Sequence, residues 1–186
     1  ANVSSYDCSP ESANSRGSYN SHLVKSKDFI RFNNIDEMPQ EKFYQLPKDK
    51  FDVIFIPNLV HHFRDQKALF DGCYKSLKKD GLILIFEPTF REIHQTPHDY
   101  IRYTPYGIEE TLKDSFFTSL ESKETGDSFE AINYILNIMK AKRDDTEFIS
   151  WCDGLAEEID RYKIGKKDIV KKHARFPTAF LTYGRK

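Results

Sequence analysis

The chain has 186 residues, a formal net charge of −1 and 31% charged residues, which fits one domain with a hydrophobic core. The balanced charge argues against nucleic acid or a membrane surface as partner. No apolar run approaches the roughly 20 residues of a membrane span, and residues 1–18 lack the apolar stretch of a secretory signal. Cys8, Cys73 and Cys152 form no CxxC pair, so we expect a cytoplasmic protein without a zinc finger or disulfide framework.

The first 50 residues carry weak signals for two strands. Residues 1–6 predict a strand, and Ser9, Pro10 and Glu11 are typical of a helix start. Residues 29–32 predict another strand, and residues 36–50 predict a polar loop.

The centre of the chain predicts a strand, a helix and a second strand. Residues 51–57 form a short apolar run rich in β-branched and aromatic residues, typical of a strand buried on both faces. Residues 65–79 have helical spacing and end in lysines followed by Gly81, a helix stop. Residues 82–86 are again apolar, so this stretch predicts a βαβ unit.

The last half predicts a loop and five further elements. The proline-containing stretch 87–105 predicts the loop, and we expect helices at 106–114, 128–142 and 147–162 and strands at 116–122 and 178–183. We treat 1–186 as one domain with a helical insertion at about 127–163. The basic stretch 161–186 is either a solvated face or a surface for an anionic partner.

Four stretches in this order resemble the class I S-adenosylmethionine-dependent methyltransferases, from the second strand of that family onward. They are FDVIFIPNLVHHF, LKKDGLILIFEP, PHDYIRYTPYGIEETLKDSFF and FLTYGRK. The resemblance implies an α/β, Rossmann-like fold: a mostly parallel sheet, flanking helices and an antiparallel last strand. It also implies a methyltransferase that uses S-adenosylmethionine.

The resemblance implies positions for the cofactor. Asp7 would end the second strand and accept hydrogen bonds from the ribose hydroxyls, although a strand-end acid can also simply cap a turn. An acceptor for the adenine amino group would be Asp36, with Asn34 as competitor. Ligands gather at the carboxyl ends of strands in such sheets. The other expected cofactor contacts are Cys8, Asn58, Leu59 and His62.

The resemblance also suggests an acceptor side and a proton acceptor. His98 or His61 is the candidate base. We expect no metal at His61 and His62, because adjacent helical residues face different ways and no third ligand is near in sequence. The candidate substrate contacts are Glu87, Tyr100, Arg102 and Tyr103. We expect a small-molecule acceptor, and the sequence does not indicate an oligomeric state.

One departure from the family concerns its glycine-rich turn. No GxGxG-like run occurs in the 186 residues, although this turn normally lets the backbone approach the cofactor closely. We therefore expect an N-terminally truncated chain. Two alternatives are a non-catalytic methyltransferase-like module that binds a protein partner, and a Rossmann-type nucleotide-sugar or dinucleotide enzyme.

Overall fold

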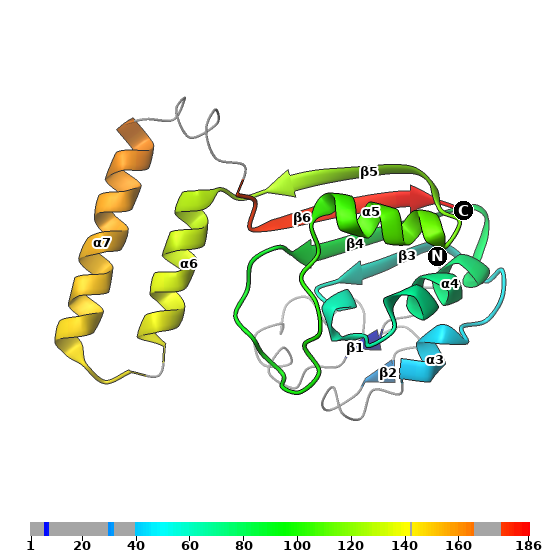
Figure 1. Cartoon of the computed structure of the whole chain (residues 1–186), viewed down its shortest axis with the longest axis horizontal. Helices are drawn as coiled ribbons and strands as arrows, with labels where there is room; N and C mark the ends of the chain where they lie inside the picture. Colours follow the sequence, from blue (N-terminus) through cyan, green and yellow to red (C-terminus); the bar gives the residue numbers. More distant parts are fainter. Residues whose placement is uncertain (1–5, 8–29, 32–39, 142, 166–175) are drawn as a thin grey trace.

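A four-stranded sheet organises the fold. The computed structural model describes residues 6–7, 30–31, 40–141, 143–165 and 176–186. The sheet has the order β3-β4-β6-β5, in which β3 and β4 are parallel and β6 runs antiparallel to β4 and to β5 (Figure 1). The bounds of these strands are β3 Phe51–Pro57, β4 Leu77–Pro88, β5 Thr118–Thr125 and β6 Ala179–Arg185.

A second, two-stranded sheet pairs β1 (Tyr6–Asp7) with β2 (Ile30–Arg31) in parallel. These strands lie within or at the edge of the two strands expected in the first quarter. The expected cofactor residues Cys8 and Asp36 and the expected helix start at residue 9 lie outside the described residues.

Two helices cover one face of the larger sheet. The helix α4 (Gln66–Ser76) is capped by the Asp65 carboxylate, and α5 (Pro105–Asp114) is capped by the Thr104 hydroxyl. Their apolar faces pack on β4 and β6 to form the core. Its fully buried members include Leu69, Phe70, Ile108 and Leu112 from the helices and Ile83, Ile85 and Phe180 from the strands.

The opposite face of the sheet is open at β3. Val53 and Phe55 are 51% and 57% exposed, although both are apolar and lie on the same side of the strand. Within the described residues, β3 pairs only with β4, so one edge of β3 lies at the border of the sheet. The expectation that 51–57 is buried on both faces is therefore wrong for the described part of the chain.

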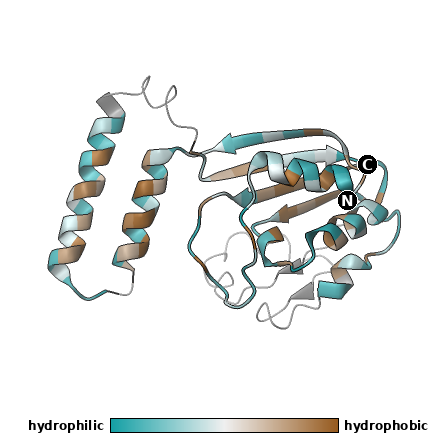
Figure 2. Ribbon diagram, viewed as in Figure 1, coloured by the Kyte–Doolittle hydropathy of each residue, from teal (hydrophilic) through white to brown (hydrophobic). Residues whose placement is uncertain are grey.

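A helical hairpin lies between β5 and β6 in the sequence. The helices α6 (Ser128–Lys140) and α7 (Thr146–Gly165) run side by side at one end of the sheet (Figure 1). Figure 2 shows that α6 is the more hydrophobic of the two. At its start, the Asp127 carboxylate accepts hydrogen bonds from the amides of Phe129 and Glu130 and pairs with Lys163 of α7.

The structure confirms most of the predicted elements and corrects three. The βαβ unit is present as β3, α4 and β4, but β4 begins at Leu77, five residues earlier than expected. The predicted loop 36–50 contains a short helix, α3 (Gln40–Tyr44). A 3₁₀ turn, η2 (Val60–His62), follows β3. None of the described helices combines the length and apolar composition that crossing a bilayer requires.

Candidate functional site

The carboxyl ends of β3 and β4 meet at one rim of the sheet. After β3 the chain turns at Asn58, whose φ of 49° is a conformation that asparagine tolerates better than most residues. The Asn58 amide donates to the Phe86 carbonyl at 2.7 Å, which fixes the turn beside β4. Asn58 is exposed, so its side-chain amide is available at this rim.

A buried carboxylate holds the turn after β3 in place. Glu87, 1% exposed, ends β4 and accepts hydrogen bonds from the amides of Leu59 and Val60, both at 2.7 Å. Its other oxygen lies 2.5 Å from Nδ1 of His61. The expected contact of Glu87 with substrate does not fit this position, because both carboxylate oxygens already serve groups inside the protein.

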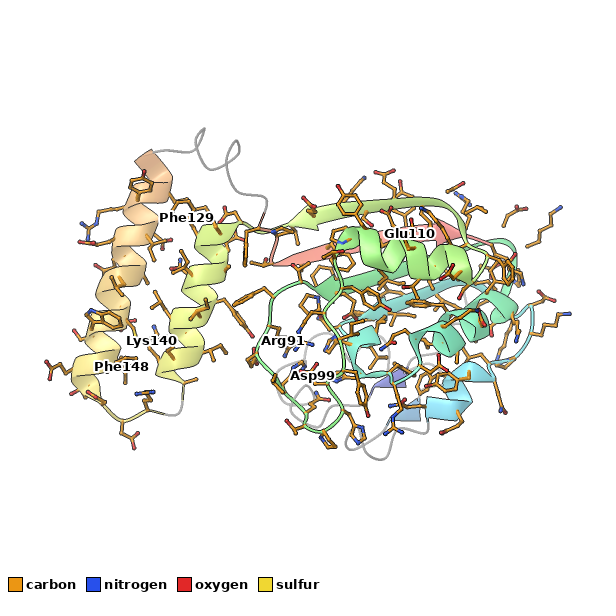
Figure 3. The ribbon with its side chains drawn as sticks, viewed as in Figure 1. Arg91, Asp99, Glu110, Phe129, Lys140 and Phe148 are labelled. Carbon is orange, nitrogen blue, oxygen red and sulfur yellow. The ribbon has the colours of Figure 1, made fainter. Side chains whose placement is uncertain are left out.

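The loop between β4 and α5 closes over this turn. The Tyr100 amide donates to the His61 carbonyl at 2.9 Å, which ties the loop to η2. Within the loop, Arg102 donates to the Asp99 carboxylate through two nitrogens and to the Glu92 carbonyl. Arg91 and Asp99 mark the course of the loop in Figure 3.

The ion pair between Asp99 and Arg102 shifts the pKa values of both groups. Burial alone would raise the pKa of Asp99, but hydrogen bonds from Arg102 and the His94 amide hold that pKa well below its usual range. The pKa of Arg102 is raised by the same hydrogen bond. The expected substrate residue Arg102 thus carries its charge against Asp99 rather than free at the surface.

His94 of the loop meets His61 and His62 of the turn after β3. The ring centroids of His61 and His62 lie 4.0 Å apart, and that of His94 lies 5.1 Å and 4.8 Å from them. Burial, and then the neighbouring His61, lower the pKa of His62 to about 4. Burial and then Arg91 also lower the pKa of His94.

This arrangement corrects the argument that adjacent histidines diverge. His61 and His62 lie on a short 3₁₀ turn in place of an α-helix, and both rings turn inward. The third ring belongs to His94, which is more than thirty positions away in the sequence. Sequence reasoning missed His94 because loop residues have no periodicity that would place them.

The remaining expected substrate residues separate into two groups. The Tyr100 hydroxyl lies 2.7 Å from Nδ1 of His98, and the Tyr100 ring faces the Arg64 guanidinium at 5.9 Å. Tyr103 is buried and its hydroxyl accepts from Thr111, so Tyr103 packs the loop onto α5. Of the expected substrate residues, Tyr100 is therefore the one that lies at the surface, where its hydroxyl contacts the candidate base His98.

A hollow of about 350 Å³ opens between this loop, the start of α5 and the segment before β6. Apolar and aromatic side chains predominate in its wall. Its lining residues are Thr89, Phe90, Thr104, Pro105, Tyr106, Glu124, Phe176 and Pro177. None of the expected site residues lines it.

Two sequence comparisons identify methyltransferases. Residues 1–83 match the family described as a methyltransferase domain. Phosphoethanolamine N-methyltransferase 1 of Arabidopsis thaliana is 28% identical over 111 residues, which is 54% of this chain and 21% of the plant enzyme. The chain thus spans about a fifth of the length of this curated relative.

One solved structure shows a similar fold at low identity, and a second is a weaker match. An S-adenosylmethionine-dependent methyltransferase from Archaeoglobus fulgidus superposes with a TM-score of 0.52 and 14% identity, covering 97% of this chain and 85% of its own. Phosphoethanolamine N-methyltransferase 2 of Haemonchus contortus, with S-adenosylhomocysteine bound, matches with a TM-score of 0.44 and 16% identity over 90% of this chain and 39% of its own. The chain therefore resembles the class I, Rossmann-like S-adenosylmethionine-dependent methyltransferases, in sequence over its first 83 residues and in its α/β fold.

Proposed function

We propose that the chain carries out, or forms part of an enzyme that carries out, methyl transfer from S-adenosylmethionine to a small-molecule acceptor. The observation that carries this proposal is the match of residues 1–83 to the methyltransferase domain family, joined to the relative in Arabidopsis. The rim formed by β3 and β4 supports it, because open α/β sheets bind ligands at the carboxyl ends of their strands.

The proposed cofactor contacts among the described residues follow two strand ends. Asp7 ends β1, where its carboxylate would accept hydrogen bonds from two ribose hydroxyls. Asn58 and Leu59 follow β3 and would line the site of methyl transfer. Cys8 and Asp36 complete the proposed set from outside the described residues, and His62 backs the turn from the protein interior.

The acceptor that we propose to test first is an amine. The curated relative is named for phosphoethanolamine, whose nitrogen lone pair can attack a methyl group on a positively charged sulfur. The carbon–sulfur bond breaks as the carbon–nitrogen bond forms, and the sulfur leaves as a neutral thioether. Such a displacement depends mainly on holding donor and acceptor in line.

The methylated nitrogen must then lose a proton. His98 is the better placed of the two candidate bases, because its ring lies beside the Tyr100 hydroxyl on the outer loop. His61 is 1% exposed and both its ring nitrogens already face other side chains. We therefore propose His98 as proton acceptor, Tyr100 as its partner and Arg102 as the residue that fixes the shape of the loop.

The proposal is tested by following S-adenosylhomocysteine formation with S-adenosylmethionine and phosphoethanolamine. We expect turnover that needs the amine and that falls at least about tenfold in Asn58→Gly, since glycine keeps the positive φ but removes the side-chain amide. Lys113→Ala, on the exposed end of α5, is the matched control and should keep wild-type turnover. Equal turnover in Asn58→Gly and wild type would contradict the proposal that Asn58 lines the site of methyl transfer.

A non-catalytic binding module remains the second candidate function. It is favoured by the lack of a GxGxG-like run in the 186 residues. A folded chain that binds neither S-adenosylmethionine nor S-adenosylhomocysteine would support this second candidate over the first.

A further inference from the structure

Three histidines, of which His61 and His62 are buried and His94 is half-buried, bring ring nitrogens together. His61, His62 and His94 each offer a ring nitrogen, and the three nitrogens lie within 4.8 Å of one another. The Nε2 atoms of His61 and His94 are 3.3 Å apart. The side chains of His61 and His94 are 1% and 14% exposed, and His62 is 2% exposed, so bulk water has little access to the cluster.

The opposite ring nitrogens fix the tautomers. Nδ1 of His62 lies 2.5 Å from the His98 carbonyl, and Nδ1 of His94 lies 3.2 Å from the Glu92 carbonyl. A carbonyl only accepts, so both Nδ1 atoms must carry the proton. Nδ1 of His61 lies 2.5 Å from the Glu87 oxygen that accepts neither amide, and a proton on Nδ1 would be donated to that oxygen.

The consequence is that each ring keeps one nitrogen with a free lone pair, and one ligand atom from each ring lies within 4.8 Å of the others. With the proton on Nδ1, a neutral imidazole leaves Nε2 as an acceptor. The contact between Nε2 of His61 and Nε2 of His94 then has no proton to share. A cation placed between the rings removes this mismatch.

The outer contacts and the spacing of one nitrogen pair match a zinc site, and the ligand atom of His62 lies within 4.8 Å of the other two. Two imidazole nitrogens at about 2.0 Å from a tetrahedral zinc ion lie about 3.3 Å apart, which is the separation of the His61 and His94 Nε2 atoms. Metal-bound histidines usually donate their other ring nitrogen to a carboxylate or carbonyl. Here each of the three does so.

We propose that the Nε2 atoms of His61, His62 and His94 bind one zinc ion, with water as fourth ligand. This site goes beyond the proposed methyl transfer and does not depend on it. The ion would fasten the loop that carries His94 to the turn that carries His61 and His62. The carboxylates of Glu87 and Asp99 lie directly behind two of the ligands and supply negative charge.

The test titrates the metal-free 186-residue chain with zinc chloride in competition with a chromophoric chelator. We expect one ion per chain, a higher melting temperature with zinc, and tetrahedral absorption bands when cobalt(II) replaces zinc. His94→Ala and His94→Gln should each weaken zinc binding by at least about 100-fold, more than the loss of an outer contact causes.

Two matched controls locate the site. His98→Ala removes a histidine from the same loop but keeps the carbonyl that accepts from His62, so it should bind zinc like the wild type. A chain with both His22 and His173 replaced by alanine should also bind normally. The proposal is overturned if the folded wild type binds no stoichiometric zinc, or if the His94 variants bind it as tightly as the wild type.

Discussion

Replacement of the buried Glu87 gives the sharpest test of how the site is built. In Glu87→Ala the amides of Leu59 and Val60 and the Nδ1–H of His61 lose their acceptor. Leu59 is half-buried and its amide can turn to water, so we count the two buried donors in full. At about 1.5–2.5 kcal/mol for each donor, the free energy of unfolding should fall by about 3–5 kcal/mol.

Glu87→Gln should cost less, about 1–2 kcal/mol. Its carbonyl can still accept both amides, but its NH₂ group then faces Nδ1 of His61, whose proton must move to Nε2. The same proton would block the ring nitrogen assigned to zinc, so zinc affinity should fall as well.

The assay is urea unfolding of metal-free protein, extrapolated to water. Glu110→Ala is the matched control, because Glu110 is an exposed residue on α5 and water screens its ion pair with Lys113, so its loss should change stability little. A free energy of unfolding for Glu87→Ala within about 1 kcal/mol of wild type would show that Glu87 does not hold these donors. Equal losses in Glu87→Ala and Glu87→Gln would also contradict this role of Glu87.

Other predictions concern helix ends and helix packing, and urea unfolding measures each of them. Asp127→Ala should lower the free energy of unfolding by about 1 kcal/mol through loss of the α6 cap, whereas Asp127→Asn keeps the cap. Burial alone would raise the pKa of Asp127, but the Glu130 amide and Lys163 lower it, so its stabilising charge is lost as the pH falls through that lowered pKa. Wild type and Asp127→Asn should therefore converge in acid, and a difference that persists there would contradict this. Gly72→Ala would place a Cβ 2.6 Å from the Phe43 carbonyl oxygen and should destabilise by about 1–3 kcal/mol. Gly154→Ala, in open space on α7, should instead stabilise by up to about 1 kcal/mol, and equal effects of the two substitutions would refute the packing argument.

The elements that sequence predicted well are those with strong local patterns. The strand at Phe51–Pro57 was predicted with its bounds, because apolar β-branched residues end there at a proline and a polar turn. The helix α4 begins beside the expected Asp65, whose carboxylate accepts from the Ala68 amide. The short helix α3 was missed because its five residues lie in a polar stretch and are held by tertiary contacts such as the bond from Gln40 to the His62 carbonyl.

The candidate site was predicted less completely than the fold. The sequence indicated Asn58, Glu87 and, in the loop after β4, His98 as residues of one rim. It could not indicate that Glu87 turns inward, because a strand-end carboxylate can bind either a ligand or the backbone of a neighbouring turn. The meeting of His94 with His61 and His62 depends on the path of a long loop, which no local pattern specifies.

Calorimetric titration of the 186-residue chain with S-adenosylhomocysteine, beside Asp7→Ala, is the first measurement we would make of S-adenosylmethionine use. We expect micromolar binding to the chain and a loss of at least about tenfold in Asp7→Ala, because two ribose hydroxyls lose their proposed acceptor. Glu110→Ala, on the exposed surface of α5, should bind like the wild type. No binding to a folded chain, or equal binding by Asp7→Ala, would contradict the account.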